Sequence, residues 1–192
     1  MTLPKLTFAA LPFVVIRHGE TDANRDGLVA GRIEAQLTPA GCAAAQALAG
    51  WIWPREIALF SSPQQRARVT AGLAFPQRTP ILLEDLRERD WGVFEGRPIA
   101  ELPPREETPE RGEPWPQMLA RVARAVAQAQ EQAKGALPIL VAHSGVIRAV
   151  RHLTSGSPHG PSAANTTPYL FAPVSNGWQE QKLTEKDRQW IA

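Results

Sequence analysis

The sequence is poor in cysteine, in long apolar runs and in charge of one sign. Its single cysteine, Cys42, cannot form a disulfide framework or a cysteine-based metal site within one chain, which favours a reducing compartment. No stretch reaches the roughly 20 apolar residues that a membrane helix needs. Lysine and arginine total 21 against 19 aspartates and glutamates, and the arginines are spread along the chain. Without a basic block, binding to nucleic acid is not indicated.

The segment KLTFAALPFVVI, residues 5–16, resembles the apolar core of a secretory signal. However, Pro12 interrupts this segment, no small-residue cleavage site follows it, and it ends on charged residues. We therefore expect a cytoplasmic protein with no membrane partner. The four histidines show none of the short spacings of zinc ligands, so neither a metal site nor another cofactor is expected.

What the sequence does contain is an alternation of apolar runs and helical segments. Three short apolar runs are typical of buried strands: FVVI at 13–16, IALFSS at 57–62 and LPILVA at 137–142. The helices predicted after them are Pro39 to about Trp53, 63–75, 117–135 and the segment after His143. This order predicts an α/β fold with a mostly parallel sheet, in which ligands bind beyond the carboxyl ends of the strands.

The stretch from Pro98 to Pro116 contains six prolines and many charges. This composition predicts a surface loop without regular structure, which is a candidate lid over a site. The helix that follows carries an apolar stripe and a glycine that could end it. The residues concerned are Met118, Val122, Val126, Ala129 and Gly135.

Polar residues follow each of the three predicted strands. Because the carboxyl ends of parallel strands meet at one edge of a sheet, we expect these residues to be neighbours. They include two arginines and two histidines, and helix N-termini point to the same edge, which describes an anion site. Guanidinium groups bind phosphate oxygens in pairs, so phosphate is the natural anion. The residues are Arg17 and His18, then Ser61, Ser62 and Arg66, then His143 and Ser144.

A histidine among arginines suits nucleophilic chemistry on phosphorus. The positive charges disfavour protonation of the imidazole, which stays neutral near neutral pH. A neutral imidazole can form a covalent intermediate and so divide one difficult transfer into two easier steps. Taken alone, Arg17 and His18 would be as consistent with an ordinary surface pair at the end of a strand as with a catalytic site.

Four blocks in order carry a family resemblance: RHGETDAN at 17–24, SSPQQRARVTA at 61–71, LRERDWGVFEG at 86–96 and VAHSGVIR at 141–148. With these blocks the chain resembles the histidine phosphatase superfamily, also called the phosphoglycerate mutase-like family. His143 is followed by serine and not by aspartate, so the chain is similar to the branch with a glutamate proton donor and not to the acid phosphatases.

The resemblance implies a role for each matching residue. His18 is the implied nucleophile, and Arg17 and Arg66 are the implied phosphate ligands, whereas Arg68 is not. Glu88 would be the proton donor, and His143 would hold the phosphoryl oxygens in the transition state.

Three further residues are implied to bind substrate. Asn24 falls on the asparagine that lines the phosphate pocket in relatives. Gly145 would contribute a backbone N–H, and Ser144 lies beside it in the fourth block.

The implied fold is a three-layer α/β/α sandwich, a mostly parallel sheet with one antiparallel strand, formed by a single domain over residues 1–192. PYLFAPV and WQEQKL, residues 168–174 and 178–183, would supply late strands. The implied activity is hydrolysis of phosphomonoesters through a phosphohistidine. The expected partner is a small phosphorylated metabolite, with a phosphoprotein substrate and a homodimer left open.

Two alternatives remain. One is a cofactor-dependent phosphoglycerate mutase-type phosphotransferase, but mutases that resemble this chain carry a long basic insertion between the acid glutamate and the second histidine. That interval is only 55 positions here (143 − 88) and includes the Pro-rich stretch. The other alternative is a non-catalytic module that binds phospholigands, and loss of a key residue, which is not seen, would have indicated it.

Overall fold

The structure is a computed structural model that describes residues 8–53 and 56–184. Residues 5–7, where the signal-like segment begins, lie outside the described residues. In the described part of the chain, no helix is long and apolar enough to cross a membrane.

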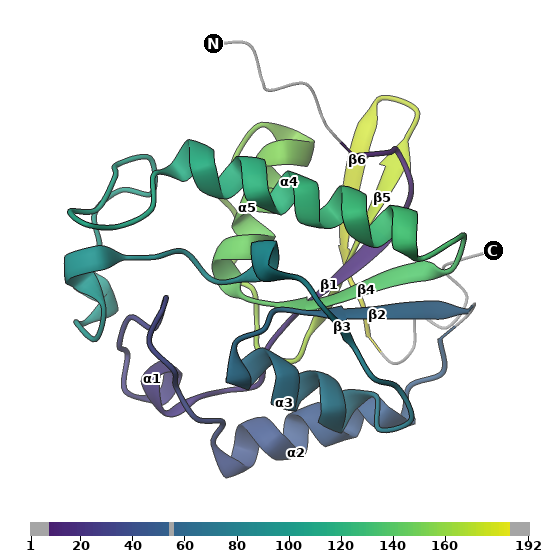
Figure 1. The fold of residues 1–192 in the computed structure, drawn as a ribbon, viewed down its shortest axis with the longest axis horizontal. Helices are drawn as coiled ribbons and strands as arrows, with labels where there is room; N and C mark the ends of the chain where they lie inside the picture. The colour runs from purple at the N-terminus through teal and green to yellow at the C-terminus, as the bar shows by residue number, and fades with distance from the viewer. Residues whose placement is uncertain (1–7, 54–55, 185–192) are drawn as a thin grey trace.

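One six-stranded sheet forms the middle of the molecule, with the strand order β3-β2-β4-β1-β5-β6 (Figure 1). Strands β1 to β4 are parallel, and β5 runs antiparallel to both of its neighbours, so it is the one reversed strand. This arrangement matches the predicted sheet. The strands are β1 (Phe13–Arg17), β2 (Ile57–Ser61), β3 (Ile81–Leu82), β4 (Leu137–Ala142), β5 (Pro168–Val174) and β6 (Gly177–Lys182).

Helices cover both faces of the sheet. Helices α2 and α3 lie against one face, and α4 and α5 lie together against the other, which gives the predicted three layers (Figure 1). The α-helices are α1 (Asp22–Arg25), α2 (Pro39–Ala47), α3 (Gln65–Ala74), α4 (Trp115–Gln132) and α5 (Ser144–Ser155). The 3-10 turns are η1 (Leu48–Gly50), η2 (Glu84–Leu86), η3 (Gly92–Phe94) and η4 (Ile99–Glu101).

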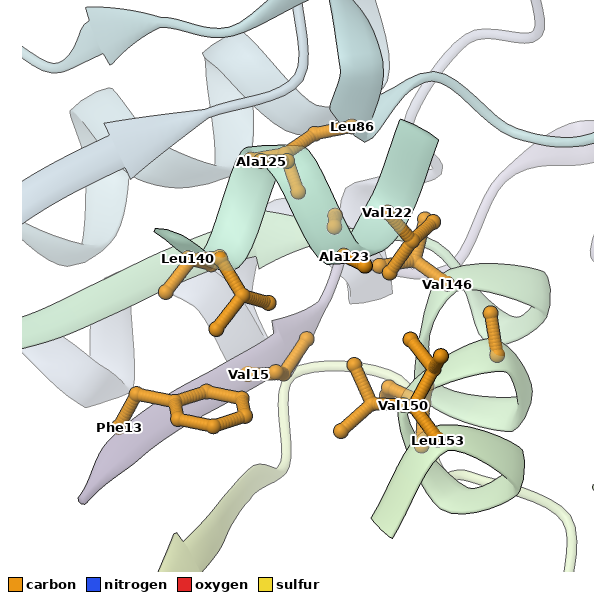
Figure 2. Packing of buried hydrophobic residues seen from close by; sticks show 14 of the residues in the cluster. Phe13, Val15, Leu86, Val122, Ala123, Ala125, Leu140, Val146, Val150 and Leu153 are labelled. Carbon is orange, nitrogen blue, oxygen red and sulfur yellow. The ribbon is translucent and has the colours of Figure 1, made fainter. Parts of the chain in front are cut away.

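Strand β1 is buried on both faces, because its side chains alternate between two apolar clusters. Phe13 and Val15 belong to the cluster under α4 and α5, whereas Val14 and Ile16 belong to the cluster on the α3 side. All four are fully buried. Figure 2 shows Phe13 and Val15 with residues of α4 and α5. Burial of each such side chain contributes about 1.5–3 kcal/mol, which makes β1 a rigid support for the residues at its end.

Helix α4 buries the predicted stripe completely, since Met118, Val122, Val126 and Ala129 have no exposed surface. It begins at Trp115, two residues before the predicted start, and ends at Gln132. A proline in the first turn lacks only an N–H that has no helical partner, so Pro116 does not delay the start. Lys134 and Gly135 then adopt positive φ angles of 48° and 93°, which turns the chain toward β4.

Two other helix boundaries differ from the prediction. Helix α2 ends at Ala47 and not near Trp53, because the chain turns at η1 and the rings of Trp51 and Trp53 pack against the core. Helix α3 begins at Gln65 and not at Pro63. The intervening Gln64 stays extended while its side chain bonds to two other segments.

The Pro98–Pro116 stretch is more ordered than predicted. It contains the turn η4, and its last two residues begin α4, so the expectation of no regular structure is wrong at both places. The fully buried Arg89 ties the rest down by donating to the carbonyl groups of Arg105, Glu107 and Glu113 at 2.7, 2.8 and 3.0 Å. A single guanidinium therefore fixes the path of this loop.

Candidate active site

The ends of β1 and β4 bring the predicted residues together. Arg17 pairs with Ala142 in the sheet, and the N–H of His18 donates to the carbonyl of Ala142 at 2.9 Å. His143 follows Ala142 directly and precedes α5. The rings of His18 and His143 consequently lie with their centroids 5.2 Å apart, although 125 positions (143 − 18) separate them in the sequence.

A cavity of about 210 Å³ opens at this edge of the sheet. Seven of the eight predicted site residues line it, and the eighth, His143, is fully buried with its ring beside that of His18. The predicted residues in the wall are Arg17, His18, Asn24, Arg66, Glu88, Ser144 and Gly145. Other residues in the wall are Thr21, Leu28, Val29, Ala30, Trp91, Ile99, Leu102, Arg105, Arg148 and Ser162.

The imidazole of His18 is held as one tautomer. Its Nδ1 lies 2.7 Å from the carbonyl oxygen of Gly19. A carbonyl can only accept a hydrogen bond, so Nδ1 carries the proton and Nε2 keeps its lone pair. Burial, together with the positive charges of Arg66 and Arg17, lowers the pKa of His18 to about 3. The ring is therefore neutral at neutral pH, with a lone pair on Nε2.

His143 is also buried and neutral. Its Nε2 lies 2.9 Å from Oγ of Ser62, while its Nδ1 is buried without a partner among the described residues. Burial, and next the charge of Arg66, lowers the pKa of His143 well below its usual range. Ser62, at the end of β2, thus orients the second ring.

Arg17 and Arg66 are guanidinium groups held by carbonyl groups alone. Arg66 donates to the carbonyls of Ala30, Gly31 and Ile33, each at 2.9 Å, and Nη1 of Arg17 donates to another loop carbonyl at 2.7 Å. Within residues 8–53 and 56–184, neither forms an ion pair with a carboxylate, and the Nε atom of each is buried without a partner. One buried charge, that of Arg66, one half-buried charge, that of Arg17, and two unused donors are suited to binding an anion.

The Glu88 carboxylate lies at the start of α5. Its Oε2 accepts from the N–H of Gly145 at 2.9 Å, and Oε1 accepts from the N–H of Arg89 at 2.7 Å. The Gly145 N–H, assigned to substrate from the sequence, therefore already has a partner. A Cβ at this position would collide with the same carboxylate, so a larger residue here would displace Glu88 from its present position.

Neither acidic neighbour of Glu88 in the sequence, Asp90 or Glu95, is among the residues that line the cavity of about 210 Å³. Asp90 accepts from the N–H of Gly92. Glu95 accepts from the N–H groups of four other residues, Gly31, Arg32, Ile33 and Trp91. Both carboxylates thus organise loops.

Two residues that support the site were not identified by the sequence analysis. Nδ2 of Asn165 donates to the carbonyl of His18 at 2.8 Å and to Oδ1 of Asn24 at 3.1 Å. Arg121 forms an ion pair with Glu113 and donates to the carbonyl of Glu88 at 3.3 Å. No motif marks either residue, because the site residues that they contact lie 33 to 147 positions away in the sequence.

No group of three or more histidine, cysteine, aspartate or glutamate side chains in the described segments is placed to hold a metal ion.

The lowered pKa of His18 predicts how stability depends on pH. Because the pKa is near 6.5 in the unfolded chain and about 3 in the folded one, the unfolded chain binds a proton first as pH falls. The stabilisation is complete above pH 6.5 and is lost below it. Between pH 7 and pH 5 we expect the wild type to lose about 2 kcal/mol more free energy of unfolding than His18→Asn.

Urea denaturation at both pH values measures this difference. His159→Asn is the matched control, because the side chain of His159 is 75% exposed. Equal pH dependence of the wild type and His18→Asn would show that His18 titrates normally in the folded protein.

Comparison with known proteins gives consistent results. A model of the histidine phosphatase superfamily (branch 1) matches residues 13–183. The metal-independent phosphoserine phosphatase of Arabidopsis thaliana is 34% identical over 156 residues, which cover 71% of this chain and 66% of that protein. The chain covers 44% and 42% of two other curated relatives, so it spans less than two thirds of their lengths.

Solved structures confirm the predicted fold. The structure of TTHB049 from Thermus thermophilus has a TM-score of 0.71 at 29% identity, covering 91% of this chain and 99% of that chain. A structure described as phosphoglycerate mutase from the same organism has a TM-score of 0.70 at 29% identity, covering 91% and 100%. With the family match over residues 13–183, these likenesses show that the chain belongs to the histidine phosphatase superfamily, as its four sequence blocks predicted.

Proposed function

We propose that the protein is a phosphomonoester hydrolase that works through a phosphohistidine on His18. One observation carries the proposal: a neutral imidazole with a free Nε2 lies in a cavity with the buried Arg66 and the half-buried Arg17, which have no ion-paired carboxylate among the described residues. A phosphoryl dianion would supply the missing negative charge and the acceptors for Nε of Arg17 and Arg66. The same dianion would then be in contact with the nucleophile.

The proposed reaction has two steps. In the first, Nε2 of His18 bonds to phosphorus, the bond from phosphorus to the leaving oxygen breaks, and Glu88 gives its proton to that oxygen. In the second, water bonds to phosphorus, the bond from phosphorus to Nε2 breaks, and Glu88 takes a proton from the water. Inorganic phosphate leaves, and His18 is neutral again. His143, whose ring lies beside that of His18, would stabilise the phosphoryl oxygens during both transfers.

Hydrolysis is better supported than the mutase reaction. A mutase must retain a bisphosphorylated intermediate, which needs a second basic cluster and exclusion of water. Three arginines between Glu88 and α4 have partners elsewhere: Arg89 bonds to loop carbonyls, and the exposed Arg97 and Arg111 pair with glutamates. Arg105 of this interval lines the cavity together with Arg148 of α5. The case against the mutase therefore rests on the short interval of 55 positions (143 − 88), which lacks the long basic insertion, and not on a lack of cations. Phosphoglycerate interconversion that depends on bisphosphoglycerate and exceeds hydrolysis would favour the mutase.

The substrate proposed is a small phosphorylated metabolite. The cavity volume of about 210 Å³ favours a short compound over a folded phosphoprotein. The Arabidopsis relative is described as a phosphoserine phosphatase, so O-phosphoserine belongs in a panel of phosphomonoesters assayed by phosphate release.

The phosphohistidine can be trapped directly. After brief incubation with a radiolabelled phosphomonoester and rapid quenching, the wild type should carry label that is stable to base and labile to acid. His18→Ala should carry none, and His159→Ala, altered at an exposed position, should label like the wild type. Folded wild-type protein that shows neither label nor turnover would indicate the non-catalytic binding module.

The role of Glu88 predicts a dependence on the leaving group. Glu88→Ala should lower kcat/KM for an alkyl phosphate about 10²–10⁴-fold, because the alkoxide needs a proton as it departs. For an aryl phosphate, which has a better leaving group, the same variant should lose much less kcat/KM. Alanine is preferred to glutamine because both carboxylate oxygens accept from backbone N–H groups, which an amide NH₂ would oppose.

Glu84→Ala is the matched control, since its side chain is 73% exposed. Equal losses of kcat/KM on both substrates for Glu88→Ala would contradict the role of proton donor.

A further inference from the structure

We propose that Arg105 and Arg148 form a second anion subsite, which binds a carboxylate on the leaving group of the substrate. This inference rests on the proposed function, because it assigns one end of the cavity to the phosphoryl group and the other to the leaving group.

The two arginines reach the cavity from separate segments. Arg105 lies in the Pro98–Pro116 loop, and Arg148 lies in α5. Both line the cavity that also contains His18 and Glu88. The loop that the sequence offered as a candidate lid therefore contributes a charged group to the wall of the site.

Neither arginine has a carboxylate partner in residues 8–53 and 56–184. The Arg148 guanidinium donates a hydrogen bond to the carbonyl of Pro158 at 3.1 Å. The guanidinium carbon of Arg105 lies 5.5 Å from the ring centroid of Trp91 and 5.7 Å from that of Trp115. Burial lowers the pKa of Arg105 to about 10, so it remains charged at neutral pH. Two partly buried cations are thus left for a ligand.

The proposed subsite lies close to Glu88, the proton donor of the proposed reaction. Burial lowers the pKa of both Arg105 and Arg148, while the negative charge of Glu88 raises both. Contacts place both segments beside this carboxylate: Glu88 accepts from the N–H of Gly145, which lies one helical turn before Arg148 in α5. The carbonyl of Arg105 accepts from Arg89, the residue after Glu88.

The charge of Glu88 also raises the pKa of Arg17 and Arg66, but it is these two arginines whose charges lower the pKa of His18. Because Glu88 protonates the leaving oxygen in the proposed reaction, groups around Glu88 face the leaving group.

A carboxylate fits this subsite for two reasons. The planar fork of a guanidinium binds a carboxylate through two parallel hydrogen bonds, and two forks can share its oxygens. A neutral leaving group would displace water from both guanidinium groups. It would not replace the hydrogen bonds that water makes to them, which is unfavourable. The small cavity further restricts the substrate to a short phosphorylated acid.

The test compares two substrates that differ only in this group. O-Phosphoserine carries a carboxylate that phosphoethanolamine lacks. We expect the wild type to prefer O-phosphoserine in kcat/KM by at least about 10-fold, the effect of one charged hydrogen bond. Arg105→Met and Arg148→Met should each reduce that preference about 10-fold, mainly through KM, while kcat/KM for phosphoethanolamine stays within about 3-fold.

Arg97→Met is the matched control, because Arg97 precedes the same loop and its side chain is 55% exposed. Equal kcat/KM for both compounds in the wild type, or equal losses on both compounds in Arg105→Met, would overturn the subsite and leave the phosphatase intact. If the folded wild type hydrolysed neither compound nor an aryl phosphate, that result would contradict the proposed function itself. It would also remove the basis for assigning one end of the cavity to the leaving group.

Discussion

Arg17 and Arg66 are guanidinium groups largely removed from water, with no ion-paired carboxylate in the described part of the chain, and the rest of the site depends on this arrangement. A buried and unpaired charge is costly, and here carbonyl groups of two loops offset part of that cost. The same two charges disfavour a proton on His18, which leaves its Nε2 free for attack. In the proposed mechanism the two arginines thus attract the phosphoryl group and also keep His18, which accepts that group, nucleophilic.

The fold supplies the rigidity that such a site requires. Strand β1 is buried on both faces, and its pairing with β4 places His18 and His143 in contact. Around this rigid edge, side chains hold the loops by their backbone atoms. Arg89 fixes the loop that carries Arg105, Arg121 fixes the backbone at Glu88, and Asn165 fixes His18. Preorganised groups need little rearrangement when charge develops in a transition state.

Much of this arrangement could be predicted from the sequence, because its strands are short β-branched runs and the residues with chemical roles directly follow them. The convergence of Arg17, His18 and His143 follows from parallel strands alone. Helix ends and the short elements α1 and β3 could not be predicted, since tertiary contacts decide them, as the indoles of Trp51 and Trp53 do for α2. The bond from Gly145 to Glu88 was also unpredictable, because it joins segments 57 positions apart.

The most direct test of the central claim is calorimetric titration of inorganic phosphate into the folded protein. The wild type and Arg68→Met, altered at an exposed position of the same helix, should bind phosphate with equal affinity. Arg66→Met should bind it at least about 10-fold more weakly, because a charged pair of hydrogen bonds is lost. Equal phosphate affinity of the wild type and both variants would show that the buried guanidinium of Arg66 does not form the anion site.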